Sequence, residues 1–495
     1  MLQALDIPPG VYRNGTQLQA AGRWWDASLV RWDGAQLAPI GGWRLRSTNA
    51  VAGAARAILP WKTNAAPPVR WIGVGTHTKL YVQDTAGTNF DITPAGFVAG
   101  GADETLNTGF GMGAFGAGAF GTARPDTGST VDAMVWDLDT FGQLLVGCAF
   151  SDGRLVEWDG NTGHPAAAIA GAPTGCLGLA ASEQGFLFAF APGGVGRRVQ
   201  WSDQGNETAW TPGPTNQAGQ VDLVTFGTIK KGVRLGSLIL VLTDVDAHVG
   251  QYVGLPSVHA FQRIGSGCGA MSKGCVVAMG QQAVWWSRSG FWQFDGGAVQ
   301  PVECEVFDFL RGDLNKGQRS KVTSLHNSEF GEVWWFYPSA SSTENDRYVA
   351  WDYRRNHWNI GGLGRLCAAQ QGIFRYPLAM DAAGLVHEHE AGLDHGGATP
   401  FAETGPILVG DGERVMRCQA IVPDEASAGQ VSVRVLGRSY PGAPEAVLQS
   451  ATFGPEGITD QRWTARQVRL RVQATGPADW RFGRPRLDLK AGGRR

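Results

Sequence analysis

The chain has 495 residues, of which 43% are hydrophobic and 17% are charged, so it lacks the low hydrophobicity and high charge of a disordered protein. Its 71 Gly and 25 Pro are too few for a collagen-like chain, but Gly stands at about twice its usual share, which indicates many turns. The net charge of −2 gives no overall attraction to nucleic acid or to an anionic membrane. Aromatic residues reach 10% and include 19 Trp, a composition that favours sheets over an all-helical bundle.

Short apolar runs of strand length recur along the chain, bounded by Gly, Asp, Gln or Ser. They include residues 144–146, 186–190, 238–242 and 283–286. Asp-Gly pairs lie between such runs, a pattern typical of antiparallel hairpins. One segment, residues 305–321, has apolar residues near helical spacing, although two Gly residues interrupt it. We therefore predict an all-β meander with one helix.

A strand that ends in an aromatic residue followed by Asp recurs four times. The four units begin at Val30, Val156, Trp292 and Val349. Their Asp residues lie 126, 136 and 57 residues apart, and each of the first two gaps holds about three units of the roughly 40–45 residues that a four-stranded propeller blade needs. The spacing is too irregular for a regular Trp-Asp repeat array, and an aromatic-Asp-Gly sequence is also a common hairpin exit. The units are either equivalent strand ends of propeller blades or ordinary ends of hairpins. With both interpretations open, we predict a β-propeller-like meander.

Two changes in composition divide the chain. The Ala/Pro-rich stretch 165–173 is expected to link two blades, and residues 398–411 lead into a Trp-poor segment. We predict a propeller-like domain over residues 1–397 and a smaller carboxyl-terminal β domain over residues 398–495.

Residues 107–122 intersperse Gly with large apolar side chains. Such a Gly-rich backbone does not hold one conformation unaided, so we expect a mobile loop inserted in the first domain. The loop either packs on its own domain as a Gly-rich hairpin or contacts a neighbouring subunit. Its interface candidates are Phe110, Met112, Phe115 and Phe120.

The seven Cys residues are scattered and include no CxxC pair, so we expect reduced thiols in the core. No charged-then-apolar leader opens the chain, and no apolar run approaches the ~18 residues needed to cross a bilayer. We therefore expect neither Sec export nor a membrane span.

The motifs of several common enzyme classes are absent: the sequence has no HExxH, no Walker-type phosphate loop and no GxSxG. A GxGxxG at 111–116 lies in the Gly/Phe loop with no helix pattern after it, which argues against dinucleotide binding. His387 and His389 alternate along a strand and, with His395, form the best metal candidate, but the spacing fixes no third ligand. A hydrogen-bonded strand end is the favoured alternative. We predict no catalytic residue, no cofactor and no metal.

A second function class, a polysaccharide-directed propeller enzyme or lectin, stays open. Residues 201–205 with Thr208 and Trp210 are similar to the Asp-box turn of sialidase-like propellers, but Ser202 and Asp203 are adjacent where that turn separates them by one residue. The turn is structural even in those enzymes. A glycosidase also needs two carboxylates about 5–9.5 Å apart in a cleft, which a sequence does not show.

The carboxyl end is basic. From Asp460 onward ten Lys or Arg residues stand against three Asp or Glu, a net of +7, which leaves 32 against 41, a net of −9, for everything before. Arg469 and Arg471 are expected to share one face of a strand. The cations form a solvated face, dock on an acidic partner subunit, or contact DNA directly. The interface candidates here are Arg462, Arg466, Arg469, Arg471, Arg481, Arg484 and Arg486.

Several short motifs, taken in their order along the chain, resemble structural proteins of bacteriophages and prophages. They include PPGVYRNGT at 8–16, GRWWD at 22–26, GTARP at 121–125, WDL at 136–138, GRL at 153–155 and RPRLD at 484–488. In this order they are similar to the tail nozzle, or packaged-DNA stabilisation, proteins of short-tailed phages, over nearly the whole chain.

The resemblance implies a structural virion protein and not an enzyme. Six copies would form a ring around the DNA exit channel of the viral tail, below the portal and adaptor, after synthesis and assembly in the cytoplasm of the bacterial host. The ring would retain the packaged genome and guide its ejection. Double-stranded DNA would pass through the lumen without sequence-specific binding, and no membrane would be involved in the assembled virion. A cellular propeller used as an adaptor is a third interpretation.

The charge distribution sets an expectation for such a ring. A closed ring needs two different surfaces on each subunit. A lumen coated with Lys and Arg would grip DNA phosphates and slow ejection, whereas the net charge of −9 before Asp460 suits a sliding duplex. We therefore expect the basic end to face protein and not the lumen.

Overall fold

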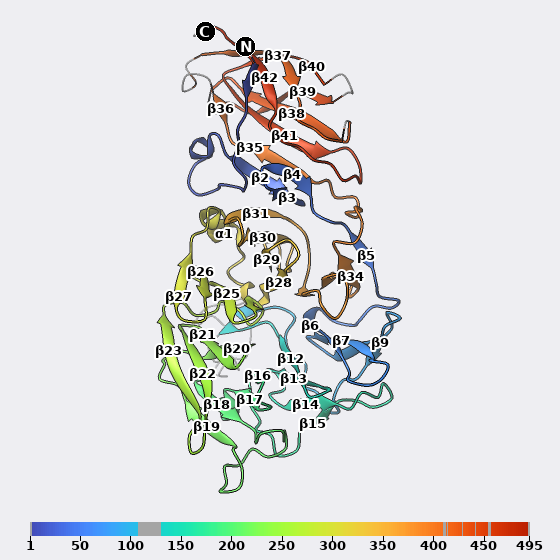
Figure 1. Ribbon diagram of the computed structural model, residues 1–495, viewed down its shortest axis with the longest axis vertical. Helices are drawn as coiled ribbons and strands as arrows, with labels where there is room; N and C mark the ends of the chain where they lie inside the picture. The colour runs from blue at the N-terminus through green and yellow to red at the C-terminus, as the bar shows by residue number, and fades with distance from the viewer. Residues whose placement is uncertain are drawn as a thin grey trace, which may run out of the picture.

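The computed structural model describes residues 2–106, 130–408, 412, 414–427, 429–440, 442–453 and 457–493. The molecule is elongated, with a ring of small sheets at one end and a pair of larger sheets at the other (Figure 1). Most of the regular structure in these residues is β-strand, which confirms the predicted all-β class.

The ring consists of seven four-stranded antiparallel sheets in the described part of the chain, numbered here as blades 1 to 7. Blade 1 consists of β6 (Ala55–Lys62), β7 (Arg70–Thr76), β8 (Leu80–Gln83) and β9 (Asn89–Asp91). Blade 2 consists of β12 (Trp136–Phe141), β13 (Leu144–Ala149), β14 (Leu155–Trp158) and β15 (Ala167–Ala168). Blade 3 consists of β16 (Gly178–Ala181), β17 (Leu187–Phe190), β18 (Arg198–Trp201) and β19 (Gly219–Asp222). Blade 4 consists of β20 (Ile229–Leu235), β21 (Leu238–Thr243), β22 (Asp246–Gly254) and β23 (Val258–Ser266). Blade 5 consists of β24 (Val276–Met279), β25 (Gln282–Ser287), β26 (Gly290–Phe294) and β27 (Val299–Val302). Blade 6 consists of β28 (Thr323–Asn327), β29 (Glu332–Tyr337), β30 (Arg347–Asp352) and β31 (His357–Gly362).

Blade 7 combines the two ends of the ring. Its strands are β32 (Cys367–Ala369), β33 (Leu378–Met380), β34 (Val386–His389) and β5 (Trp43–Leu45). The early strand β5 pairs with β34, with Leu45 opposite His387 and Trp43 opposite His389. The first strands of the blades lie side by side in order, and β32 lies beside β6 again. The ring is therefore a closed β-propeller, and the ladder between β5 and β34 fastens its first and last segments.

Three of the four aromatic-Asp units occupy the same place in a blade. Trp158, Phe294 and Trp351 stand at the end of the third strand of blades 2, 5 and 6. The fourth unit is different, because Trp32 lies on β3 (Val30–Asp33). Among the described residues β3 pairs with β4 (Gln36–Pro39) alone, outside the propeller.

The second part, called here the sandwich, is built from two sheets. One sheet has the order β1 (Leu2–Ala4), β42 (Arg486–Ala491), β37 (Met416–Val422) and β40 (Thr459–Ala465). The other has the order β2 (Trp24–Ser28), β35 (Phe401–Thr404), β41 (Gln467–Ala474), β38 (Val431–Arg438) and β39 (Ala446–Thr452), with β36 (Ile407–Leu408) also on β41. Buried side chains of both sheets belong to one core, so the sheets pack face to face.

Strand pairing crosses the expected division at residue 397. The sandwich starts with β35 at Phe401, as the change in composition after residue 398 indicates. However, β1 and β2 belong to this sandwich and not to the propeller, because they pair with β42 and β35. The amino-terminal segment thus contributes strands to the sandwich and then, through β5, to the propeller.

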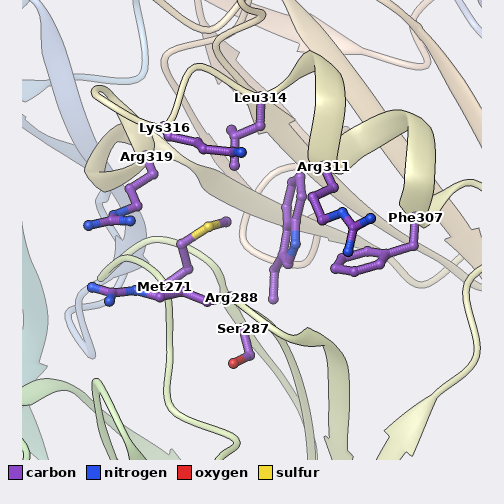
Figure 2. A pocket seen from close by; sticks show the side chains of 9 residues that line it. Met271, Ser287, Arg288, Phe307, Arg311, Leu314, Lys316 and Arg319 are labelled. Carbon is purple, nitrogen blue, oxygen red and sulfur yellow. The ribbon is translucent and has the colours of Figure 1, made fainter.

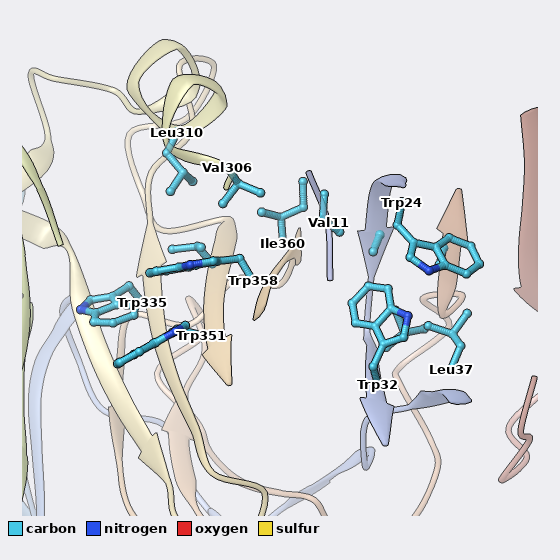
Figure 3. Close-up of a cluster of buried hydrophobic side chains, with 14 of the residues drawn as sticks. Val11, Trp24, Trp32, Leu37, Val306, Leu310, Trp335, Trp351, Trp358 and Ile360 are labelled. Atoms are coloured by element: carbon cyan, nitrogen blue, oxygen red, sulfur yellow. The ribbon is translucent and has the colours of Figure 1, made fainter. Parts of the chain in front are cut away.

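The two parts share one hydrophobic core. Trp335 and Trp358 of blade 6 are fully buried and stack at 6.2 Å between ring centroids. Figure 3 shows Ile360 and Val11 between these rings and the buried Trp24 and Trp32 of β2 and β3. The same cluster continues into the sandwich, so the propeller and the sandwich are joined by packing as well as by strand order.

The predicted helix is confirmed in part. The α-helix α1 covers Phe307–Asp313, with Leu310 buried, and a short 3₁₀ helix η3 covers Arg319–Lys321. The α-helix ends there because Leu314 adopts an extended backbone. Two further 3₁₀ helices are η1 (Gln17–Ala20) and η2 (Pro192–Gly194), and a small hairpin is formed by β10 (Thr105–Leu106) and β11 (Thr130–Val131). Within the described ranges, no helix is long and apolar enough to span a membrane.

Candidate interaction surfaces

Charged side chains of the innermost strands meet in the propeller interior. Asp137 on β12 is almost fully buried and accepts a hydrogen bond from Lys231 Nζ on β20 at 2.6 Å. Lys273, just before β24, lies 3.4 Å from the other carboxylate oxygen. Burial alone would raise the pKa of Asp137, but the charges and hydrogen bonds of the two lysines outweigh it and hold the pKa below its usual range. The cluster joins three blades by ion pairs that are sheltered from water.

The connection from blade 1 to blade 2 reaches other blades. Asp132 pairs with Lys230 of β20 at 2.6 Å, and Asp103 pairs with Lys321 before β28 at 2.5 Å. Glu104 adds a backbone hydrogen bond to the side chain of Gln318. The base of this connection is therefore anchored to blade 4 and to the segment between blades 5 and 6. The interface candidates Phe110, Met112, Phe115 and Phe120 lie outside the described residues, as does the GxGxxG motif.

An exposed apolar group that the sequence analysis did not single out lies beside blade 4. Phe226 is fully exposed, Val224 is 82% exposed and Val245 is 45% exposed. Their two loops are held together, because Thr228 N–H donates to Asp244 Oδ1 at 2.8 Å. No periodic pattern marks these residues in the sequence, since they lie in turns. Exposed apolar side chains gathered in one place are typical of a contact surface.

The two central candidates of the basic end are paired within the chain. Arg469 and Arg471 of β41 share one face of the strand, as expected, and both reach the carboxylate of Glu403 on β35. Arg469 also bonds Glu445, with Nε 2.8 Å from Oε1. Burial alone would lower the pKa of Arg469, but its hydrogen bond to Glu445 and the nearby carboxylates raise it above its usual value. Arg471 lies over the ring of Phe401 at 3.5 Å.

The remaining candidates are spread over different parts of the sandwich. Arg481 bonds Asp479, and Arg484 lies 3.1 Å from Asp6. Arg466 is half-buried, whereas Arg462 and Arg486 are exposed. The seven arginines therefore do not form one cluster.

Four exposed cations nevertheless lie on the outward face of the sheet of β1, β42, β37 and β40, which they share with Asp460 and Asp488. Inward-facing residues such as Cys418, Trp463 and Leu487 are buried, and the alternate residues face solvent. Arg417 on β37 is opposite Lys490 on β42. The exposed cations of this surface, called here the basic face, are Arg417, Arg462, Arg486 and Lys490. Figure 1 shows its strands at the end of the molecule far from the propeller. Sequence alternation could have found Arg417, which the count from Asp460 onward omitted.

The histidine-rich segment is a hydrogen-bonded strand end. His387 bonds Asp381 at 2.9 Å, and His389 accepts a hydrogen bond from Arg365 Nε at 2.8 Å. His395 lies 3.0 Å from the Ile40 carbonyl. Burial lowers the pKa of His389 well below its usual range, and the charge of Arg365 adds to this effect. Within the described part of the chain, no group of three or more His, Cys, Asp or Glu side chains is arranged to hold a metal ion.

The Asp-box-like turn also has a structural role. Trp201 Nε1 donates to the Gln217 carbonyl at 2.8 Å, and Asp203 Oδ1 accepts from Gln217 N–H at 2.7 Å. These bonds close the loop between β18 and β19 of blade 3. The indole N–H of Trp201 and the Oδ1 of Asp203 therefore have hydrogen-bond partners within the blade.

These features define the class of fold: a closed β-propeller with a β-sandwich at its side. No protein-family model matches the sequence, and no curated protein matches it. Solved structures with a similar arrangement include a virginiamycin B lyase from Staphylococcus aureus, at 8% identity and a TM-score of 0.44, covering 70% of this chain and 99% of that one. The Pan2 WD40 domain of Neurospora crassa has 9% identity and a TM-score of 0.37, covering 72% and 95%. The N-terminal domain of Nup159 has 9% identity and a TM-score of 0.38, covering 74% and 98%.

Proposed function

We propose that the protein is a non-catalytic structural subunit of a short-tailed phage tail, and that several copies, six by the family resemblance, form the nozzle ring around the DNA exit channel. The observation that carries the proposal is the way the amino-terminal segment is built into both parts of the molecule. It supplies β1 and β2 to the sandwich and β5 to blade 7. A subunit that resists the force of packaged DNA must not separate into its parts.

The connection between the two parts is stiff. Separating them would break the ladder of β5 with β34 or those of β1 and β2 with the sandwich. It would also expose the shared aromatic core around Trp335 and Trp358. Each buried large side chain contributes roughly 1.5–3 kcal/mol. This construction suits a wall that transmits load, and it needs no bond-making centre.

The surfaces suit assembly. The basic face lies at the far end of the sandwich, and the apolar group around Phe226 lies on the propeller. A head-to-tail ring needs two complementary surfaces on each subunit, and the apolar group around Phe226 is a candidate for one of them, while the basic face is left for a different partner. An acidic surface of the portal or adaptor is the partner that complements the basic face.

The test compares two charge-reversal variants in virion assembly. The first, R417E/R462E/K490E, changes the basic face. The second, K62E/R70E/R263E, changes three exposed cations of the propeller by the same charge. We expect the first to lose co-sedimentation with portal-adaptor complexes and the second to keep it. Electron images of virions, with the chain labelled, should place the protein at the tail axis.

A protein that is absent from the virion tail, or that binds or cleaves host polysaccharide as a monomer, would contradict the proposal. Normal assembly of the basic-face variant would contradict only the assignment of that face to the portal or adaptor.

A further inference from the structure

Four cations surround a cavity of about 230 Å³ beside blades 5 and 6. Arg288 lies in the turn between β25 and β26, Arg311 lies on α1, and Lys316 and Arg319 lie in the segment that leads to β28. Figure 2 shows Arg288, Lys316 and Arg319 gathered on one side of the cavity, with Arg311 on the other side near Phe307. We call this the connector pocket.

Within the part of the chain that the structure describes, the charge of the connector pocket is not neutralised. Arg311 has one distant partner there, Asp308, at 3.9 Å. In the described ranges, the side chains of Arg288, Lys316 and Arg319 make no ion pair or hydrogen bond. The nearby acid Asp313 is already used, because it accepts a hydrogen bond from Tyr337 at 2.9 Å and pairs with Arg347 at 3.4 Å. By contrast, the interior lysines 230, 231, 273 and 321 all have carboxylate partners.

The lining and the volume of the pocket favour small anionic groups. Trp286 and Phe307 contribute to its wall, and three of its four cations are arginines. A guanidinium presents a planar fork that matches the oxygens of a phosphate, and apolar surroundings keep its stem in place. The cations are exposed or half-exposed at the mouth, so they are accessible to a ligand that lies outside the cavity. The cavity is smaller than the roughly 300–1,000 Å³ of a site that encloses a drug-sized ligand.

We propose that the connector pocket binds phosphate groups of the DNA duplex backbone. This inference rests on the proposed function for the identity of the ligand, since duplex DNA is what a nozzle contains. It also limits the expectation that the lumen does not hold DNA phosphates. The chain before Asp460 carries a net charge of −9, so contact with DNA is confined to a local cluster in an otherwise acidic part. Such a cluster retains the genome by a limited number of contacts and still lets it slide.

The test is binding of a labelled short DNA duplex to the purified full chain, measured by fluorescence anisotropy at several salt concentrations. The variant R288Q/K316Q/R319Q removes three charges from the connector pocket. The matched control K62Q/R70Q/R263Q removes three exposed charges from other parts of the propeller. We expect the pocket variant to bind all duplex sequences more weakly and to lower the slope of log affinity against log salt by about 3, one for each lost phosphate contact. The control should keep the wild-type affinity and slope.

Two further ligands, a nucleoside triphosphate and polyglutamate, separate the alternatives to duplex DNA. Equal losses in the two variants, or no binding by the wild type, would overturn the proposal. Saturable binding of a nucleoside triphosphate that is lost in the pocket variant, without duplex binding, would assign the same phosphate chemistry to a free nucleotide and overturn the DNA assignment. Tighter binding of polyglutamate than of duplex would assign the pocket to an acidic protein. Virion images test the proposed function separately. If the protein lies in the tail but its pocket does not bind DNA, only this inference is refuted. If the protein binds DNA but is absent from virions, the nozzle role is refuted.

Discussion

Arg31 and Glu332 form a bidentate ion pair between the β3–β4 hairpin and blade 6. Arg31 Nε lies 3.0 Å from Glu332 Oε1, and Nη2 lies 2.9 Å from Oε2. Arg31 Nη1 also donates to Glu390 at 3.0 Å, and Phe330 covers the guanidinium at 3.5 Å. All three charged side chains are at most 10% exposed. The pair therefore links β3, which leads from the sandwich, to β29 in blade 6.

The first prediction concerns removal of this cation. Arg31→Met leaves Glu332 and Glu390 buried beside each other without a positive charge. We expect the free energy of unfolding to fall by on the order of 3–5 kcal/mol, because the two buried carboxylates lose the positive charge that neutralises them. Chemical denaturation measures this change. Lys79→Met breaks an exposed ion pair with Asp91 and should leave the unfolding midpoint unchanged. Equal midpoints for Arg31→Met and wild type would show that the pair does not hold the junction.

A second prediction concerns Arg469, an interface candidate that is paired with two carboxylates of its own chain. Because Arg469 is buried against Glu403 and Glu445, Arg469→Glu places three carboxylates together on the face of the β41 sheet that points away from the core of the sandwich. We expect this variant to destabilise the sandwich itself, by on the order of 3–5 kcal/mol, before any contact with a partner is affected. Hydrogen exchange should increase along β41 and β35. Arg462→Glu, on the exposed outer face of the same sandwich, should keep the wild-type exchange pattern.

Local patterns predicted several features, and long-range pairing explains what they missed. Trp158, Phe294 and Trp351 mark equivalent strands because each blade repeats the same local hairpin. The alternation of β41 correctly placed Arg469 and Arg471 on one face. Their partner Glu403, however, is more than sixty residues away, and no local signal shows it. The pairing of β1 with β42 joins the two ends of the chain, so no periodicity near either strand indicates it. Three of the four cations of the connector pocket lie close together within residues 311–319, but only the packing of blade 5 brings Arg288 to them.

A third prediction addresses the interior ion cluster. Asp137→Asn removes the carboxylate that neutralises Lys231 and Lys273. Two sheltered cations then repel each other, and we expect the thermal midpoint of the propeller to fall, with a loss of roughly 3 kcal/mol or more. Adding Lys231→Met to this variant removes one of the two charges and should restore part of the stability. If the double variant is no more stable than Asp137→Asn, repulsion between the lysines is not the cause of the loss.

The last prediction is a pH dependence set by His259 in blade 4. His259 is 7% exposed and lies among aromatic rings, with its ring centre 4.7 Å from that of Phe186 and 5.0 Å from that of Trp201. Burial lowers the pKa of His259 to about 4, whereas an unfolded chain has a histidine pKa near 6.5. Between these two values the unfolded state binds more protons than the folded state, so stability falls as the pH falls from about 6.5 to 4. The full contribution is up to about 3 kcal/mol. His259→Phe keeps an aromatic ring and cannot take up a proton, so its free energy of unfolding should change less over this range, as measured by urea denaturation at each pH. The exposed His164→Gln is the matched control and should follow the wild type. A His259→Phe profile parallel to that of the wild type would show that protonation of His259 does not contribute to acid sensitivity.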